Sequence, residues 1–180
     1  PVHYEYIKTQ MDMDNYIDYN IVEIFMANNN WTHHNVKFWR PKTPNGRWRW
    51  ILCDLDWGFR ITSTNMFKRL KAGDPFLSEE EGNSLYVPLW LKLIENQDFK
   101  YTFINRFADY LNTIFTPDAI LQRINEIKSQ FEPEMPNHIA RWKDISLPPY
   151  ERIESINHWY SNIDSLEVFA EQRPAAIRTH

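Results

Sequence analysis

Two aspartates, Asp54 and Asp56, stand two residues apart at the end of an apolar segment. Side chains alternate along a strand, so a strand in this segment would place both carboxylates on one face. Ionised carboxylates in apolar surroundings are costly unless they are paired. A divalent cation would pair with both, and all-oxygen ligation favours Mg²⁺, Mn²⁺ or Ca²⁺ over zinc. These aspartates are therefore the first candidates for a metal site.

The strand that would carry them belongs to a predicted β-hairpin. Asn45-Gly46 separates residues 36–40 from residues 47–56, and both segments are rich in aromatic and β-branched residues. Asn-Gly between two such segments is typical of a tight hairpin turn. Pro41 and Pro44 precede the turn. They favour a bulge or a longer loop, which would shift the pairing by one residue.

The predicted pairing brings a third oxygen to the two carboxylates. A turn at Asn45-Gly46 places Asn35 opposite Asp56 and Lys37 opposite Asp54. The amide of Asn35 would then complete a set of oxygen ligands. Alternatively, Asp54 pairs with Lys37 or an arginine, and Asp56 caps the turn that follows it. Both interpretations fit the residues.

The two faces of the hairpin are predicted from the same alternation. Ile51 and Cys53 would face the core together with Phe38, and Trp50 would share the other face with the aspartates. Trp48 and Trp50 alternate with arginines. This pattern favours cross-strand packing of the rings under arginine stems over stacking on bases or sugars.

Most of the remaining chain is predicted to be helical. Apolar residues recur at helical spacing over residues 12–28, 85–95, 99–115, 117–131, 135–142 and 150–171. Asp12 or Asp14 is the expected N-cap of the first helix, and Thr116 caps another before Pro117. Residues 60–84 have no clear period and are expected to be a loop. Pro174 is expected to begin a final short turn.

Composition limits the classes of protein that fit. The 180 residues are 43% hydrophobic and 16% aromatic, enough for one domain with its own core. We therefore predict a single domain over residues 1–180, α+β and mainly α, with helices packed around one antiparallel β-hairpin. The net charge of −4 argues against a nucleic-acid partner. No apolar run is long enough for a transmembrane segment.

Residues 29–59 resemble the core of the CotH (spore coat protein H) kinase-like family. The shared pattern contains Asn30-Trp31, Asn35 before a strand, the Asn45-Gly46 turn, and the sequence Asp54-Leu55-Asp56-Trp57-Gly58-Phe59. Flanking sequences also resemble the family, at residues 11–19 and 169–174.

The resemblance implies an atypical, reduced protein-kinase fold that is secreted or displayed on a cell or spore surface. It implies transfer of phosphate from ATP to a protein substrate or coat protein, with Mg²⁺ or Mn²⁺ held by Asn35 and Asp56. The catalytic positions implied are Asn30, which would position the acceptor, and Asp54, an auxiliary acid. The chain corresponds to the C-terminal lobe, and the nucleotide-anchoring N-terminal lobe is expected outside it.

One departure from the family pattern concerns the expected catalytic base. Asn30 occupies the position where an aspartate is expected, and an amide cannot accept a proton at neutral pH. The chain opens with Pro1 and contains four glycines, with no glycine-rich phosphate loop. We therefore expect a piece of a longer protein that is inactive alone. The alternative function is a non-catalytic structural or adhesion module, secreted or on a surface, that retains the kinase-like fold.

Overall fold

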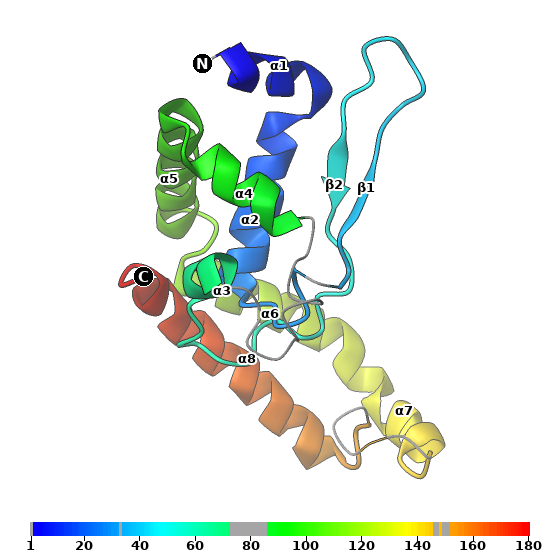
Figure 1. The fold of residues 1–180 in the computed structure, drawn as a ribbon. Helices are drawn as coiled ribbons and strands as arrows, with labels where there is room; N and C mark the ends of the chain where they lie inside the picture. Colours follow the sequence, from blue (N-terminus) through cyan, green and yellow to red (C-terminus); the bar gives the residue numbers. More distant parts are fainter. Residues whose placement is uncertain (1, 33, 73–85, 146–147, 149–151) are drawn as a thin grey trace.

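The protein is mainly helical, with one small antiparallel sheet. A computed structural model describes residues 2–32, 34–72, 86–145, 148 and 152–180 (Figure 1). Its elements are α1 (Val2–Gln10), α2 (Met13–Met26), β1 (Lys37–Trp39), β2 (Arg49–Ile51), α3 (Met66–Ala72), α4 (Tyr86–Ile94), α5 (Gln97–Asn112), α6 (Pro117–Phe131), η1 (Glu132–Glu134), α7 (Met135–Trp142) and α8 (Ile156–Ile177). The predicted α+β, mainly α class is confirmed.

Helix α2 forms the centre of the core, between α5 and the hairpin (Figure 1). Its apolar residues repeat at three- and four-residue spacing, and Tyr16, Ile21 and Ile24 are fully buried. The predicted N-cap is confirmed, because the Asp12 side chain accepts from the backbone N–H of Asn15 at 3.2 Å.

The predicted phenylalanine ladder of α5 is also part of the core. Phe99, Phe103 and Phe107 are buried on one face of α5. Trp90 of α4 packs edge-on against Phe103, with 4.9 Å between ring centroids. Burial of this many aromatic rings supplies much of the driving force that holds α4 and α5 on α2.

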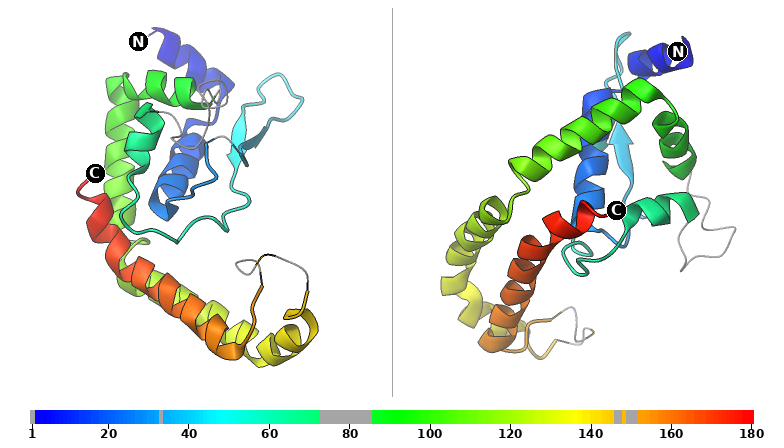
Figure 2. Two further views of the ribbon diagram at one scale, coloured as in Figure 1. Left: turned by 60° about the horizontal axis from the view of Figure 1, so that its bottom comes forward. Right: turned by 90° about the vertical axis from the view of Figure 1, so that its left-hand side faces the viewer.

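Helices α6 and α8 pack along each other and carry α7 at their far end (Figure 2). The predicted Thr116 cap with Pro117 at the first helical position is confirmed. The prediction that Pro174 begins a new turn is wrong, because Pro174 lies inside α8. Phe169, Ala170 and Ile177 of the same helix are buried. Their packing outweighs the local preference of proline for a helix end.

Two helices lie where the sequence pattern predicts none. Helix α1 was not predicted, and α3 lies within residues 60–84, where a loop was expected. The starts of the predicted helices at residues 85 and 150 lie outside the described residues.

The predicted register of the hairpin is wrong by three residues. The observed pairs are Lys37 with Ile51, Phe38 with Trp50, and Trp39 with Arg49. Residues 40–48 form the connection, and the N–H of Gly46 closes a turn by donating to the Thr43 carbonyl at 3.0 Å. The two prolines cannot join the ladder as donors, which lengthens the loop. A Cβ at Gly46 would overlap the backbone oxygen of Pro41, so the turn requires glycine.

The predicted faces of the hairpin are reversed as well. Trp50 packs on Tyr16 of α2, with 4.6 Å between ring centroids, whereas Ile51 is exposed. The cause is Asn15, whose amide oxygen accepts from the Trp50 N–H at 2.6 Å and whose amide nitrogen donates to the Trp50 carbonyl. This side chain replaces a neighbouring strand and fixes Trp50 inward. The predicted cross-strand packing is confirmed: Phe38 contacts both Trp48 and Trp50.

Candidate functional site

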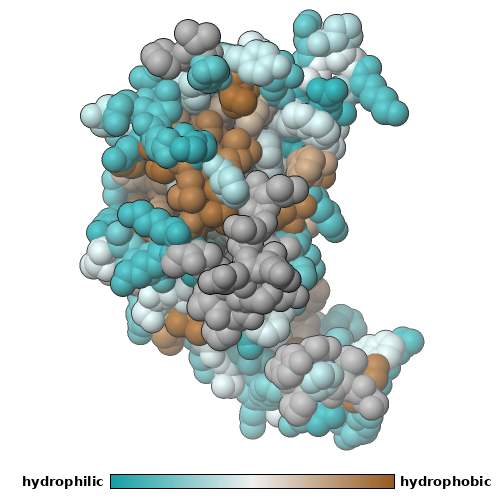
Figure 3. All heavy atoms as spheres, in the orientation of Figure 1, coloured by the Kyte–Doolittle hydropathy of each residue, from teal (hydrophilic) through white to brown (hydrophobic). Residues whose placement is uncertain are grey.

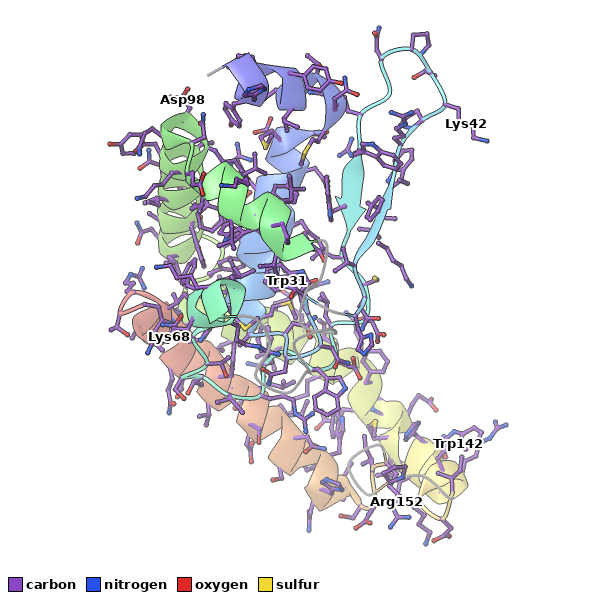
Figure 4. The ribbon with its side chains drawn as sticks, viewed as in Figure 1. Trp31, Lys42, Lys68, Asp98, Trp142 and Arg152 are labelled. Carbon is purple, nitrogen blue, oxygen red and sulfur yellow. The ribbon has the colours of Figure 1, made fainter. Side chains whose placement is uncertain are left out.

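Two loops meet where the hairpin joins the body of the protein. The first loop (residues 27–32 and 34–36) connects α2 to β1, and the second loop (residues 52–59) follows β2. Both lie beside the C-terminal end of α2, at the opposite end of the hairpin from its tip (Figure 1). Lys42 marks that tip, well away from the body of the protein (Figure 4).

The two loops run antiparallel, as two hydrogen bonds show. The backbone N–H of Asn29 donates to the Trp57 carbonyl at 3.4 Å. Six residues further along the first loop, the Asn35 carbonyl accepts from the Cys53 thiol at 3.3 Å. All four sequence-predicted site residues (Asn30, Asn35, Asp54 and Asp56) are therefore carried on two adjacent segments.

The opposition of Asn35 and Asp56 expected from the hairpin register is wrong. Strand β2 ends at Ile51, and the residue across from Asn35 is Cys53. Asp54 has a left-handed backbone with φ of 57°, which breaks the strand alternation that was to align it with Asp56. The two aspartates are thus loop residues, and both are exposed.

The donor chemistry of these loops suits a hard divalent cation. Two exposed carboxylates and the amide of Asn35 are the oxygen donors that Mg²⁺ and Mn²⁺ accept. Within the described ranges, no cluster of three or more histidine, cysteine, aspartate or glutamate side chains could hold a metal. A cation here would therefore need further oxygens, and Mg²⁺ sites of this kind take them from substrate phosphates and water.

Left-handed backbone is concentrated in these loops. Among the described residues, the non-glycine positions with positive φ are Ala27, Asn35, Asp54 and Phe59, with φ between 54° and 60°. Such a conformation costs roughly 1–2 kcal/mol per residue and persists where the surroundings impose it. For Phe59, the backbone N–H donates to the Met26 carbonyl at 2.8 Å and the ring stacks on Phe169 at 4.5 Å.

Arg173 of α8 holds the end of α2 and the segment that follows the second loop together. Its guanidinium is fully buried and donates to four backbone carbonyls at 2.7–2.8 Å, those of Ile24, Phe25, Thr62 and Thr64. Two of these carbonyls, those of Ile24 and Phe25, lie in the last turn of α2, where the carbonyls lack their full set of intrahelical donors. Burial lowers the pKa of Arg173 to about 10, so the side chain is still charged at neutral pH. Residues 169–174 of α8 therefore support the base of the site.

Arg69 of α3 fixes the first loop from another side. Its guanidinium donates to the side-chain oxygen of Asn29 at 2.7 Å and to the Asn29 carbonyl at 3.0 Å. Asn29 directly precedes Asn30, so α3 helps to set the position of that candidate residue. Neither arginine was identified from the sequence, because a single long-range contact leaves no periodic pattern.

A buried carboxyl group lies beneath the first loop. Glu23 and Asn28 are fully buried, and the Asn28 amide donates to the Glu23 carboxyl at 2.9 Å. Burial raises the pKa of Glu23 to about 7, although hydrogen bonds from Asn28 and Tyr19 oppose the shift. Trp31, labelled in Figure 4, is buried as well and packs edge-on against Tyr19, with 6.3 Å between ring centroids. The sequence signal for Glu23 was available but unused: an acid between Ile21 and Ile24 on a buried helix.

Other surfaces lie apart from the two loops. An apolar groove of about 530 Å³ is lined by α3, α4, α5 and the end of α8. Apolar side chains gather over α4 and α5 in Figure 3. Within the described part of the chain, no helix combines the length and the apolar character that crossing a membrane requires.

Comparison with known proteins finds a family whose model matches the chain. Residues 2–177 match the model of the family described as CotH kinase protein. No curated protein and no solved structure matches the chain. The family match spans nearly all of the 180 residues, including both loops and the supporting helices. The chain therefore belongs to the CotH kinase family.

Proposed function

We propose that the full-length protein is a metal-dependent kinase that transfers the γ-phosphate of ATP to a protein substrate. The observation that carries this proposal is the antiparallel contact of the two loops at the base of the hairpin. Membership of the CotH kinase family supports it independently.

The order of functional residues along the chain supports a kinase more than another metal-dependent enzyme. In protein kinases, a catalytic aspartate precedes a metal-binding asparagine by five residues, and an Asp-Phe-Gly aspartate binds the metal. Asn30 and Asn35 have the same five-residue spacing, and Asp56-Trp57-Gly58 follows the hairpin. The first loop would thus serve as the catalytic loop and the second as the metal-binding segment.

We assign each candidate residue one part of the reaction. Asn35 and Asp56 would hold Mg²⁺ or Mn²⁺, and Asp54 would support them. When bound, the metal supplies compensation for the charge of the phosphates. Asn30 would orient the acceptor hydroxyl by a hydrogen bond, since its amide cannot take the proton. Phosphoryl transfer depends mainly on positioning and electrostatics, so the reaction can proceed without a strong base.

The remaining parts of the proposal rest on the family. The nucleotide would be anchored mainly by an N-terminal lobe outside these 180 residues. Secretion or display on a cell or spore surface, with coat or surface proteins as substrates, is the setting that a CotH kinase suggests.

A second candidate function is favoured by Asn30. The amide at the position expected for a carboxylate fits a protein that has kept the fold as a structural or adhesion module and lost turnover. This protein would retain the supporting contacts of Arg173 and Arg69 and would not transfer phosphate.

Phosphotransfer by the full-length protein separates the two functions. We expect incorporation of ³²P from radiolabelled ATP at fixed Mn²⁺, and its loss in Asp56→Ala, which lacks a metal ligand. Asp109→Ala is the matched control, because Asp109 is an exposed carboxylate on α5. Equal incorporation by the wild type and Asp56→Ala would show that the second loop is not the site. Absence of incorporation by the wild type would favour the non-catalytic module.

A further inference from the structure

A chain of hydrogen bonds links the interior to Asn30. The Glu23 carboxyl accepts from the side-chain nitrogen of Asn28 at 2.9 Å. The side-chain oxygen of Asn28 accepts from the backbone N–H of Asn30 at 3.2 Å. Asn28 is also tied through its backbone, because its N–H donates to the Glu23 carbonyl and its carbonyl accepts from Trp31.

The orientation of the Asn28 amide follows from its neighbours. A backbone N–H can only donate, so the Asn28 oxygen must face Asn30. The Asn28 nitrogen then faces Glu23, whose carboxyl oxygen is the acceptor it needs. Glu23 thereby sets the direction of the amide that holds Asn30.

Among the described residues, the side chains that shift the pKa of Glu23 are Asn28 of the first loop and Tyr19, one turn earlier on α2, and neither is a cation. Two residues of the loops in turn affect Tyr19. Cys53 of the second loop raises the pKa of Tyr19 electrostatically, and Trp31 of the first loop lowers it through a side-chain hydrogen bond. If Glu23 only filled space in the core, its replacement by leucine or glutamine would not lower the stability of the protein. Its use as an acceptor for Asn28 gives it a specific task.

We propose that Glu23 is a positioning residue that fixes Asn30, through the side chain of Asn28, in the phosphoryl-transfer site. The role in catalysis rests on the proposed function, whereas the link from Glu23 to the Asn30 backbone does not. Glu23 touches neither substrate nor metal and acts through Asn28.

Two substitutions separate the ionisation of Glu23 from its role as a hydrogen-bond acceptor. Glu23→Gln keeps an oxygen acceptor for Asn28 and removes ionisation, whereas Glu23→Leu removes the acceptor and leaves the Asn28 nitrogen unsatisfied. Glu171→Gln, at an exposed position of α8, is the matched control. All variants are made in the full-length protein.

Amide hydrogen exchange over residues 28–32 gives the readout that is independent of activity. In Glu23→Leu, we expect the Asn30 amide to exchange at least about tenfold faster, with the core amides of α5 unchanged. In the wild type, the opening constant of this segment should rise by up to about two orders of magnitude from pH 4.5 to 7, after correction for intrinsic exchange. Glu23→Gln should abolish this rise, and Glu171→Gln should keep it.

Phosphotransfer kinetics test the catalytic part. Glu23→Leu should lower kcat on the order of 10- to 100-fold, with the KM for ATP within about twofold, because acceptor alignment is lost while nucleotide binding is kept. Unchanged exchange of the Asn30 amide in Glu23→Leu would overturn the proposal. So would a pH-dependent rise that persists in Glu23→Gln. Altered exchange without any wild-type phosphotransfer would support the link to Asn30 and refute only the proposed function.

Discussion

Replacement of Arg173 tests whether α8 holds the candidate site together. Arg173→Met removes the buried guanidinium and its hydrogen bonds to four backbone carbonyls, of which the Ile24 carbonyl keeps the N–H of Ala27 as a donor. A buried acceptor that loses its donor costs about 1–3 kcal/mol, and several carbonyls lose Arg173 at once. We therefore expect the free energy of unfolding to fall by about 4 kcal/mol. With an m value of about 2 kcal/mol/M in urea, the midpoint would fall by about 2 M.

The geometry of the guanidinium predicts a second result at the same position. Arg173→Lys keeps the charge but presents a single ammonium group, which cannot span carbonyls on α2 and on the segment that follows the second loop. It should recover less than half of the lost stability. Urea unfolding followed by tryptophan fluorescence measures both variants.

The matched control is Arg123→Met on α6. Arg123 is 69% exposed and forms a surface ion pair with Glu126, so its loss should cost less than about 1 kcal/mol. If Arg173→Met destabilised the protein no more than Arg123→Met, the bridging role of Arg173 would be refuted.

Four further predictions address the two loops and the contacts of α2 with the first loop and the hairpin. Glu23→Gln should raise the free energy of unfolding by up to about 3 kcal/mol at pH 8 and by little at pH 4. Because the pKa of Glu23 is raised from 4.5 to about 7 in the folded protein, the stability that Glu23 contributes is fully present below pH 4.5 and is lost as pH rises to 7; thermal unfolding across that range would check this. Asn30→Asp should raise phosphotransfer about 10²- to 10⁴-fold if a base is what the site lacks, as radiolabelled ATP would measure; a decrease would show that the amide itself is needed. Asp54→Ala should lower phosphotransfer less than Asp56→Ala, and the reverse order would exchange the roles assigned to them. Asn15→Leu should cost about 2–3 kcal/mol, because Trp50 loses both bonds to the amide; unchanged urea unfolding would contradict this.

The helices could be predicted from the sequence because their information is local. Asp12 and Thr116 are caps that act within three residues, and Phe99, Phe103 and Phe107 repeat at the helical period. Helix α7 was predicted with the bounds that the structure has. Pro174 was misplaced because burial of its neighbours depends on α2 and the second loop, which are distant in sequence.

The hairpin shows where local pattern fails. Asn45-Gly46 indicated the region of the turn, which spans residues 43–46, but the register depends on two prolines and on Asn15, thirty-five residues before Trp50. Asn15 fixes the inward face of β2, and no periodicity within the hairpin contains that information. The expected alignment of Asn35 with Asp56 failed for the same reason, although the loops that carry them do meet.

The supports of the site could not be predicted from spacing. Arg173, Arg69 and Glu23 each act through side-chain contacts that the chain makes only after folding. Among these, Glu23 alone carried a usable signal, an acid on the apolar side of a helix. An acidic residue on the apolar side of a predicted helix is therefore a good candidate for a functional role.

The most direct test of the central claim is calorimetry of Mn²⁺ and ATP with the full-length protein and its Asn35→Ala and Asp56→Ala variants. We predict weak binding of Mn²⁺ alone, tighter binding with ATP present, and loss of at least about tenfold in affinity for Mn²⁺–ATP in each variant, because phosphates complete the ligand set. Binding of Mn²⁺–ATP that is equally tight in the wild type and in both variants would contradict the claim that the two loops form the metal site.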